Sequence, residues 1–280
     1  MTEQLIRNVS DTAAWAAWYR ALESRRPDAL FRDPYAERLA GERGARIAGS
    51  NKMRDAWAWT MRTVLFDDLL REELRQGTDM VVNLAAGLDA RPYRMDVPAD
   101  LRWVEVDLPA PLDYKESILA GERPRCRLER VRLDLADRGA RRELFARLGS
   151  ESKRAVVISE GLLIYIDATG VGELAEDLAA VPALQRWMVD IVSPGLLAML
   201  RKQMGAQVEA ANAPFRFGPE EGPEFFLPHG WRPLRVRPLF HEGARYRRVP
   251  LWMRPFAWIP PANGRQGRRP WSGVVLLGRA

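Results

Sequence analysis

At 280 residues the chain is long enough to bury a full hydrophobic core in one domain without disulfides or a structural metal. Hydrophobic residues make up 47% and charged residues 29%, which excludes a disordered chain; the single cysteine, Cys126, excludes an intramolecular disulfide, and no Cys or His pairs show metal-ligand spacing. The net charge of +6 does not indicate a nucleic-acid partner, because acidic residues are mixed with the arginines in segments such as FDDLLREELRQG.

Two helices are predicted before any strand. The first covers residues 11–25, where large apolar side chains recur at i, i+3, i+4 and i+7: Trp15, Trp18, Tyr19 and Leu22. Pro27 and Pro34 interrupt the helical pattern in a turn-rich piece, and a longer helix follows over 51–76. We expect residues 1–77 to form a helical lid.

Short apolar runs then predict strands that alternate with helical segments. The first five runs cover residues 80–84, 102–106, 127–133, 155–159 and 186–192. Such alternation is typical of an α/β fold with a parallel sheet and helices on both faces. Two later runs, 234–239 and 272–279, predict an antiparallel edge pair. We therefore expect a single domain over 1–280 with a seven-stranded, mostly parallel, Rossmann-like sheet, a ligand-binding core over 78–195, and a substrate cap with closing strands over 196–280.

Acidic residues follow three of the predicted strands at the point where each strand ends: Asp107, Asp134 and Glu160. In a parallel sheet the carboxyl ends of the strands lie at one edge, where ligands bind. Three carboxylates at one edge would repel one another unless each faces a separate donor. The pattern predicts a ligand with several hydroxyl and amino groups. The alternative is that Asp107 and Glu160 are N-caps of the helices that follow.

The first strand ends in a turn of small side chains, AAGLDAR, over residues 85–91. Ala85 and Gly87 leave room for a ligand to approach the backbone. Asp107 follows about 20 positions later, where a carboxylate accepts hydrogen bonds from both ribose hydroxyls. The turn lacks the G-x-G-x-x-G pattern, and Asp89 would repel a pyrophosphate. We expect a nucleoside ligand without a phosphate.

Several segments, in the same order, resemble the leucine carboxyl methyltransferase family of S-adenosylmethionine-dependent enzymes, including its branch that methylates small molecules in polyketide pathways. They are SRRPDALFRDPYAERL, MRTVLFDDLL, VVNLAAGLDARPYRM, WVEVDLP, ISEGLLIYI and APFRFGPEEGPEFFLPHGWRP, and they cover most of the chain. The resemblance implies a class I methyltransferase sheet, S-adenosyl-L-methionine as cofactor and S-adenosyl-L-homocysteine as product.

The resemblance also implies roles for individual residues. Arg62 would hold the carboxylate of the methionine part of the cofactor, and Glu160 would lie beside its amino group. The turn after the first strand would line the same part. The residues implied for the ribose and adenine are Asp107, Leu108, Asp134 and Leu135. A surface ion pair of Arg62 with Asp67 or Glu72 is the alternative.

Two positions depart from the pattern of the family. Ala85 stands where the family commonly has the first glycine of G-A-G. Ala136 stands where the protein-methylating branch tends to have an arginine that meets the substrate carboxylate. The second difference favours a small-molecule acceptor over a protein tail.

Methyl transfer by direct displacement needs alignment and exclusion of water rather than a covalent nucleophile. A carboxylate acceptor is ionised at neutral pH, whereas a phenol, with a pKa of about 10, would need a base or a positive charge. The candidates on the acceptor side are Tyr165 as a pocket wall, Arg91 as a charge-stabilising group and His229 as a base; the alternative for Arg91 is that it orders the turn together with Asp89. Four tryptophans are candidates for the roof of a pocket, with core packing as the alternative: Trp15, Trp18, Trp57 and Trp59.

Three other functions share parts of this pattern: a nicotinamide-dependent oxidoreductase, a carboxyl methyltransferase acting on a protein C-terminus, and a catalytically silent cofactor-binding subunit. No apolar run approaches the roughly 18 residues of a membrane span, and the N-terminal segment does not resemble a signal peptide. We expect a cytoplasmic enzyme with a small-molecule acceptor and with no metal, nucleic acid or membrane among its partners.

Overall fold

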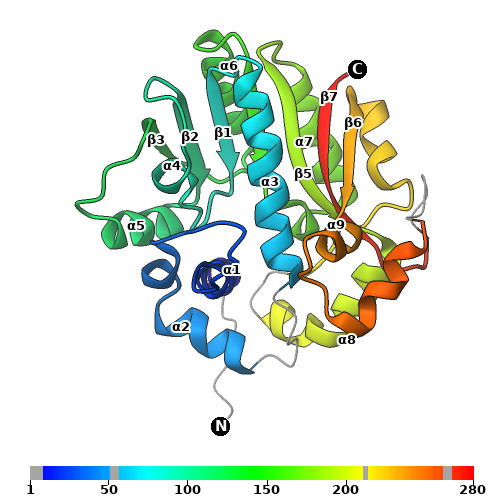
Figure 1. Ribbon diagram of the computed structural model, residues 1–280. Helices are drawn as coiled ribbons and strands as arrows, with labels where there is room; N and C mark the ends of the chain where they lie inside the picture. Colours follow the sequence, from blue (N-terminus) through cyan, green and yellow to red (C-terminus); the bar gives the residue numbers. More distant parts are fainter. Residues whose placement is uncertain (1–8, 51–56, 211–213, 261–266) are drawn as a thin grey trace.

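Seven strands form one sheet in the order β3-β2-β1-β4-β5-β7-β6, with helices on both faces (Figure 1). The structure is a computed structural model and describes residues 9–50, 57–210, 214–260 and 267–280. The strands are β1 Met80–Leu84, β2 Arg102–Asp107, β3 Arg127–Arg132, β4 Ala155–Ser159, β5 Leu184–Val192, β6 Trp231–Pro238 and β7 Ser272–Arg279. Strands β1 to β5 are parallel, and β7 runs antiparallel between β5 and β6. The predicted α/β fold with a seven-stranded, mostly parallel sheet is confirmed.

The helical elements precede the sheet, connect its strands and extend from its carboxyl edge. They are α1 Val9–Ser24, α2 Ala36–Ser50, α3 Trp57–Arg75, α4 Arg91–Arg94, α5 Pro109–Ile118, α6 Arg138–Ser150, α7 Ala168–Ala179, α8 Pro194–Ala210 and α9 Leu239–Arg245, with the 3-10 helices η1 Leu163–Tyr165, η2 Gly222–His229 and η3 Leu251–Trp258. The predicted helix over 51–76 corresponds to α3, and its first six residues lie outside the described part of the chain.

The order of the strands reverses at β1: the strands that follow it in the chain lie first on one side of it and then on the other. The chain moves outward from β1 through β2 to β3 and then returns to place β4 on the other side of β1. Val82 in the middle of β1 is therefore in register with Val104 of β2 and with Val157 of β4. Ligands of parallel sheets bind beyond the carboxyl ends of the strands at such a reversal. The order of the strands thus directs attention to the loops that follow β1, β2 and β4.

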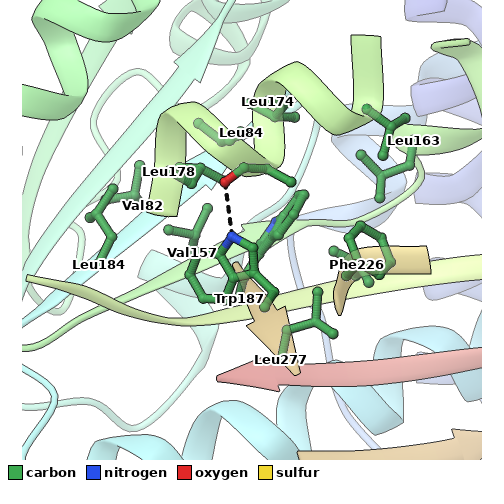
Figure 2. Packing of buried hydrophobic residues seen from close by; sticks show 14 of the residues in the cluster. Val82, Leu84, Val157, Leu163, Leu174, Leu178, Leu184, Trp187, Phe226 and Leu277 are labelled. Atoms are coloured by element: carbon green, nitrogen blue, oxygen red, sulfur yellow. Dashed lines mark hydrogen bonds between the residues drawn. The ribbon is translucent and has the colours of Figure 1, made fainter. Parts of the chain in front are cut away.

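Helices cover both faces of the sheet, so that every residue of β1 is buried. Alternate residues of β1 face opposite sides because side chains alternate along a strand. Val82 and Leu84 pack with Leu174 and Leu178 of α7 on one face, where Trp187 of β5 lies in the same cluster (Figure 2). On the other face Val81 packs with apolar residues of α3. These two layers hold the carboxyl ends of the central strands rigidly.

The first two helices lie at the carboxyl edge of the sheet (Figure 1). They are in close contact, because a Cβ added at Gly44 of α2 would lie 2.5 Å from the carbonyl oxygen of Ala14 in α1. Arg20 of α1 donates a hydrogen bond of 2.5 Å from Nη2 to the carbonyl oxygen of Leu88, in the turn after β1. The N-terminal helices therefore lie over the strand ends, where the lid was expected.

Two helical segments differ in extent from the prediction, and one of them, α2, is kinked at Gly41, which has φ 57° and ψ −170°. Residues 25–41 were expected to be turn-rich, but α2 begins at Ala36, directly after the segment that Pro34 interrupts. Order was expected to loosen after residue 195, yet α8 begins at Pro194. Ser193 accepts a hydrogen bond of 3.2 Å on its side chain from the backbone N–H of Leu196, which is N-terminal capping of that helix.

Candidate functional site

Two residues of the turn after β1, separated by one residue, lie in the left-handed backbone region. Ala85 has φ 51° and Gly87 has φ 46°. Glycine adopts this region freely, whereas an alanine there costs on the order of 1 kcal/mol. A Cβ added at Gly87 would lie 3.3 Å from the Cβ of Ala13 in α1. The turn is thus tight, strained at one residue, and closely covered by the first helix.

Asp107, the last residue of β2, holds this turn. Its Oδ2 accepts a hydrogen bond of 2.7 Å from the backbone N–H of Gly87, and its Oδ1 accepts one of 2.7 Å from the N–H of Leu108. Burial raises the pKa of Asp107, and the two backbone donors offset part of that effect. Each carboxylate oxygen can accept a further hydrogen bond from a ligand. Leu108 beside it is 46% exposed.

The loop after β3 lies beside Asp107. The backbone N–H of Leu133 donates a hydrogen bond of 2.9 Å to the carbonyl oxygen of Asp107. Asp134 folds back on its own loop, because its Oδ1 accepts from the N–H of Ala136 at 2.9 Å. Leu135 is partly buried against the core. The structure therefore brings Asp134 and Leu135 next to Asp107, with Asp134 shaping the loop.

Arg62 reaches the carboxyl edge from α3. Its Nε donates to Oε1 of Glu160 at 3.1 Å, and its Nη1 donates to Oδ2 of Asp190 at 3.3 Å. Burial opposes the positive charge of Arg62, but the charges of Asp190 and Glu160 keep its pKa above the ordinary value. The guanidinium also lies over the ring of Trp59, 4.8 Å from the ring centroid. Among the described residues, Nη2 of Arg62 has no hydrogen-bond partner.

Gly161 provides the surface on which Arg62 lies. It has φ 69°, and a Cβ added there would lie 3.2 Å from Nη1 and 3.3 Å from Nη2 of Arg62. Its backbone N–H donates a hydrogen bond of 2.6 Å to Oδ1 of Asp190. The carboxylate of Asp190 thus connects the loop after β4 to the guanidinium from α3, and burial raises the pKa of Asp190.

A buried ion-pair network links Glu160 to the turn after β1. Arg91, whose side chain is 2% exposed, lies 2.8 Å from Glu160 Oε2, 2.6 Å from Asp67 Oδ1 and 2.9 Å from Asp89 Oδ2. Asp67 also accepts from Arg94 at 2.7 Å. With three carboxylates around it, Arg91 is placed to fix the turn and Glu160, and its guanidinium is not directed at the acceptor side.

Asp67 was considered only as a surface partner of Arg62. The structure places it among the buried residues instead, paired with Arg91 and Arg94. Arg62 pairs with carboxylates of β4 and β5 at the sheet edge. The surface ion-pair alternative for Arg62 is therefore wrong.

Tyr165 lies on the other side of Arg62, in η1. Burial raises the pKa of its hydroxyl, while a hydrogen bond with Thr12 and the charge of Arg62 act in the opposite direction. Its ring contacts Phe215 with centroids 5.6 Å apart. Trp59 also packs in this cluster, so the region beside the guanidinium is largely aromatic. Tyr165 therefore remains a neutral hydroxyl at neutral pH, facing the lid helix.

The four tryptophans considered as a pocket roof lie in different places. Trp15 and Trp59 pack against each other with ring centroids 4.9 Å apart, in the cluster that contains Tyr165. Trp57 packs against Phe240 of α9 instead, and Trp18 packs near α2. Only the first pair lies beside the Arg62 guanidinium.

His229 is not brought to this cluster. Its Nδ1 lies 3.0 Å from Oε1 of Glu176 on α7, and the next strand begins two residues later at Trp231. Trp231 pairs with Arg279 at the end of β7, which is the edge opposite the carboxyl ends of the parallel strands. The chain has already crossed to the far edge at this point, so His229 is not positioned to act as a base beside Glu160.

The structure adds Asp190 to the residues that the sequence indicated, and it shows the contact made by Gly161, which follows Glu160 after the fourth predicted strand. Asp190 could have been noticed, because an acidic residue inside the otherwise apolar run RWMVDIV indicates a buried polar contact. Within the described residues, no group of three His, Cys, Asp or Glu side chains is arranged to hold a metal ion. The described helices include none with the length and apolar character of a membrane span.

The chain is similar to a known protein family and to individual proteins of bacteria. Residues 13–179 match the leucine carboxyl methyltransferase family. A proposed S-adenosyl-L-methionine-dependent methyltransferase of Streptomyces avermitilis is 33% identical over 235 residues, covering 79% of this chain and 82% of the relative. Another from Frankia alni is 34% identical over 249 residues, covering 81% and 84%.

Two solved structures share the fold. A DUF574 family protein from Streptomyces avermitilis has a TM-score of 0.59 at 12% identity, covering 95% of this chain and 97% of that one. A proposed methyltransferase from Thermobifida fusca has a TM-score of 0.59 at 14% identity, covering 99% and 96%. At these identities the likeness concerns the arrangement of the sheet and helices alone.

Proposed function

Because the chain belongs to the leucine carboxyl methyltransferase family, we propose that it transfers a methyl group from S-adenosylmethionine to an oxygen of a small-molecule acceptor. The chain is an S-adenosylmethionine-dependent methyltransferase, as its family and its relatives are. The proposal adds that the acceptor is a carboxylate or phenol of a polyketide-like metabolite. It is supported by Ala136, which stands where the protein-methylating branch tends to have an arginine for its substrate.

The residues at the sheet edge fit this cofactor in chemistry. Asp107 has lone pairs left for the two ribose hydroxyls, because each of its oxygens accepts only one backbone hydrogen bond among the described residues. Nη2 of Arg62 is available to a carboxylate, and Glu160 and Asp190 supply negative charge for an ammonium group. Glycine at position 87 allows close approach to the backbone. The bound cofactor would supply a methyl group already activated by the positive charge on sulfur.

The single observation that carries the proposal is that Asp107 and Glu160 lie at the carboxyl ends of the two strands that flank β1, and that Arg62 reaches the same edge of the sheet from α3. Arg62 and Glu160 are joined directly, and the network through Arg91 and Asp89 continues from Glu160 to the turn that Asp107 holds. A cofactor with a charged amino acid at one end and a ribose in the middle matches this order of groups.

The remaining task of the protein is to align the acceptor and exclude water. The aromatic residues beside Arg62 provide an apolar wall, and α1 lies over the turn after β1. We propose that the Tyr165 hydroxyl orients the acceptor oxygen by a hydrogen bond. Its raised pKa keeps it protonated at neutral pH, so it can donate but does not accept a proton as a base. A carboxylate acceptor, which is already ionised, suits this arrangement best.

Isothermal titration with S-adenosylhomocysteine, on the natural protein and on Arg62→Ala, tests the site. We expect binding by the natural protein and a loss of about tenfold or more in affinity for the variant, since a hydrogen bond to a charged group is removed. Equal affinity would contradict the assignment of Arg62. Titration with NADH separates the oxidoreductase alternative, because only that class predicts its binding.

A second experiment separates the kinds of acceptor. Cell extract is incubated with the enzyme and with cofactor labelled in the methyl group, and the products are then divided by size. Label in the small-molecule fraction is expected. Label confined to protein would support methylation of a protein C-terminus instead, and absence of label with normal cofactor binding would support a silent cofactor-binding subunit.

A further inference from the structure

The segment between β6 and β7 carries a cluster of exposed apolar side chains. None of the residues of η3 is buried. Five large apolar side chains, which we call the η3 patch, are exposed: Leu251 75%, Trp252 72%, Phe256 57%, Trp258 90% and Ile259 54%. Single exposed apolar residues are common in soluble proteins, but five within nine residues mark an interaction site.

The segment that carries the η3 patch connects β6 to β7 at the carboxyl edge of the parallel strands. β6 ends at Pro238 and β7 begins at Ser272, and Ser272 is in register with Val192 at the end of β5. In Figure 1 this segment is the orange-red coil beside α9. His241 Nε2 of α9 lies 2.8 Å from the carbonyl oxygen of Ile259, which fixes the far end of the patch to the body of the protein.

Arginines precede and follow the patch in the sequence, and the same stretch of chain has no acidic residue. Residues 243–280 contain eight arginines and no aspartate or glutamate. Arg247 precedes the patch, Arg268 and Arg269 follow it, and all three are exposed. The rest of the sequence mixes acidic residues with its arginines, so this stretch is exceptional in the chain. Arg245 and Arg248 pair with acidic residues outside this stretch, whereas Arg247, Arg268 and Arg269 form no ion pair with the described residues. Exposed indole rings together with these three guanidinium groups are complementary to an apolar partner that carries negative charge.

We propose that the η3 patch binds the surface of an anionic lipid membrane. Trp side chains favour the headgroup level of a bilayer, where the ring is apolar and its N–H is hydrated. The exposed arginines would lie against anionic headgroups, each contributing an attraction that salt weakens. The binding is peripheral and independent of methyl transfer. It differs from the expectation from the sequence that the protein has no membrane partner.

A second copy of the chain fits the patch less well. A symmetric dimer through this segment would bring the same surface of both subunits together, because the interface of a two-fold dimer is self-complementary. Arg268 and Arg269 of one copy would then face the same arginines of the other copy and repel them. Residues 243–280 contain no acidic residue that could offset this repulsion.

The test is flotation of the full chain with vesicles of phosphatidylglycerol and phosphatidylcholine, compared with vesicles of phosphatidylcholine alone. We expect binding to the anionic vesicles at low salt, and its loss at high salt. The double variant Trp252→Ser with Trp258→Ser should bind at least about tenfold more weakly, because two apolar anchors are lost. Arg268→Glu with Arg269→Glu should weaken binding by about fivefold or more for each arginine.

Leu227→Ser is the matched control, because Leu227 is 48% exposed on η2 and lies outside the patch. It should bind the vesicles as the natural protein does. Absence of flotation with anionic vesicles, equal binding to neutral vesicles, or unchanged binding of the tryptophan variant would overturn the proposal. A monomer–dimer equilibrium that the tryptophan variant abolishes, without any vesicle binding, would assign the patch to a second copy.

Discussion

Asp190 of β5 accepts a hydrogen bond of 2.6 Å from the backbone N–H of Gly161, after β4, and so joins two neighbouring strands at their carboxyl ends. The other oxygen of the same carboxylate accepts from Arg62. The carboxylate of Asp190 is therefore held by the backbone at the edge of the sheet, and it in turn orients the guanidinium of Arg62. The proposed binding of the cofactor carboxylate depends on this arrangement.

Replacing Asp190 with Asn preserves the shape and removes the charge. Arg62 then loses one of its two anionic partners, and we expect affinity for S-adenosylhomocysteine to fall about tenfold, since hydrogen bonds between charged groups are about twice as strong as neutral ones. Titration calorimetry measures the change. Asp68→Asn is the control, because Asp68 pairs with Arg71 and Arg237 elsewhere on the protein. An equal loss in both variants would indicate a general effect on the fold.

Replacing Gly161 with Ala should displace Arg62. The added Cβ would meet the guanidinium at 3.2 Å, and we expect at least about a fivefold loss of cofactor affinity together with about 1 kcal/mol of lost stability from the left-handed backbone. Gly121→Ala separates these effects. Gly121 has φ 87° and nothing within 4 Å of an added Cβ, so this variant should lose stability and keep its affinity. Normal binding by the Gly161 variant would contradict the role given to Gly161.

Replacing Ala85 with Gly should stabilise the protein. Ala85 has φ 51°, where glycine is not strained, and the gain of about 1 kcal/mol is offset in part by the greater freedom of glycine in the unfolded chain. The expected result is a Tm about 1 to 3 °C higher, measured by calorimetry. Ala86→Gly, at the buried neighbour outside the left-handed region, should lower the Tm. A lower Tm for both variants would show that Ala85 is unstrained.

Cofactor affinity should depend on pH through Asp107. Its pKa is raised by burial, so the folded protein takes up a proton on Asp107 at a higher pH than the unfolded chain does. That group alone therefore makes the fold less stable as pH rises through this window. Cofactor affinity should change in the opposite sense, because only the ionised carboxylate accepts from both ribose hydroxyls.

Calorimetric titration of S-adenosylhomocysteine over a series of acidic pH values measures this dependence. Affinity should fall as pH drops through the raised pKa of Asp107. Asp107→Asn should bind more weakly at neutral pH and show a smaller change with pH; what remains belongs to Asp190, whose pKa is also raised. An Asp107→Asn variant with the full pH dependence would show that Asp107 does not titrate in the binding step.

The strands were predictable because burial on both faces demands continuous apolar runs, as in MVVNL of β1. The positions of Asp107 and Glu160 followed from the ends of these runs. α8 was missed because its sequence lacks a clear apolar face, although Ser193 and Pro194 are a common start of a helix. A capping residue alone is a weak signal when no periodic pattern follows it.

The contacts of Arg91 with Asp67 and Glu160 and the position of His229 could not be predicted from the sequence. Asp89 lies two residues before Arg91 and its contact is local, but Asp67 and Glu160 come from distant parts of the chain, and no spacing shows that they converge on Arg91. His229 lies in a segment whose motif resembles the family, but its distance from the site depends on which way β6 runs. Long-range pairing decides both, and local patterns do not encode it.

The antiparallel insertion of β7 between β5 and β6 has a consequence for biosynthesis. β6 pairs with β7, so a nascent chain that has emerged only as far as Pro238 exposes the edge of β5 and leaves β6 without a neighbour. Such open edges invite aggregation. About forty further residues must therefore be synthesised before β7 can pair with both β5 and β6 and close this part of the sheet.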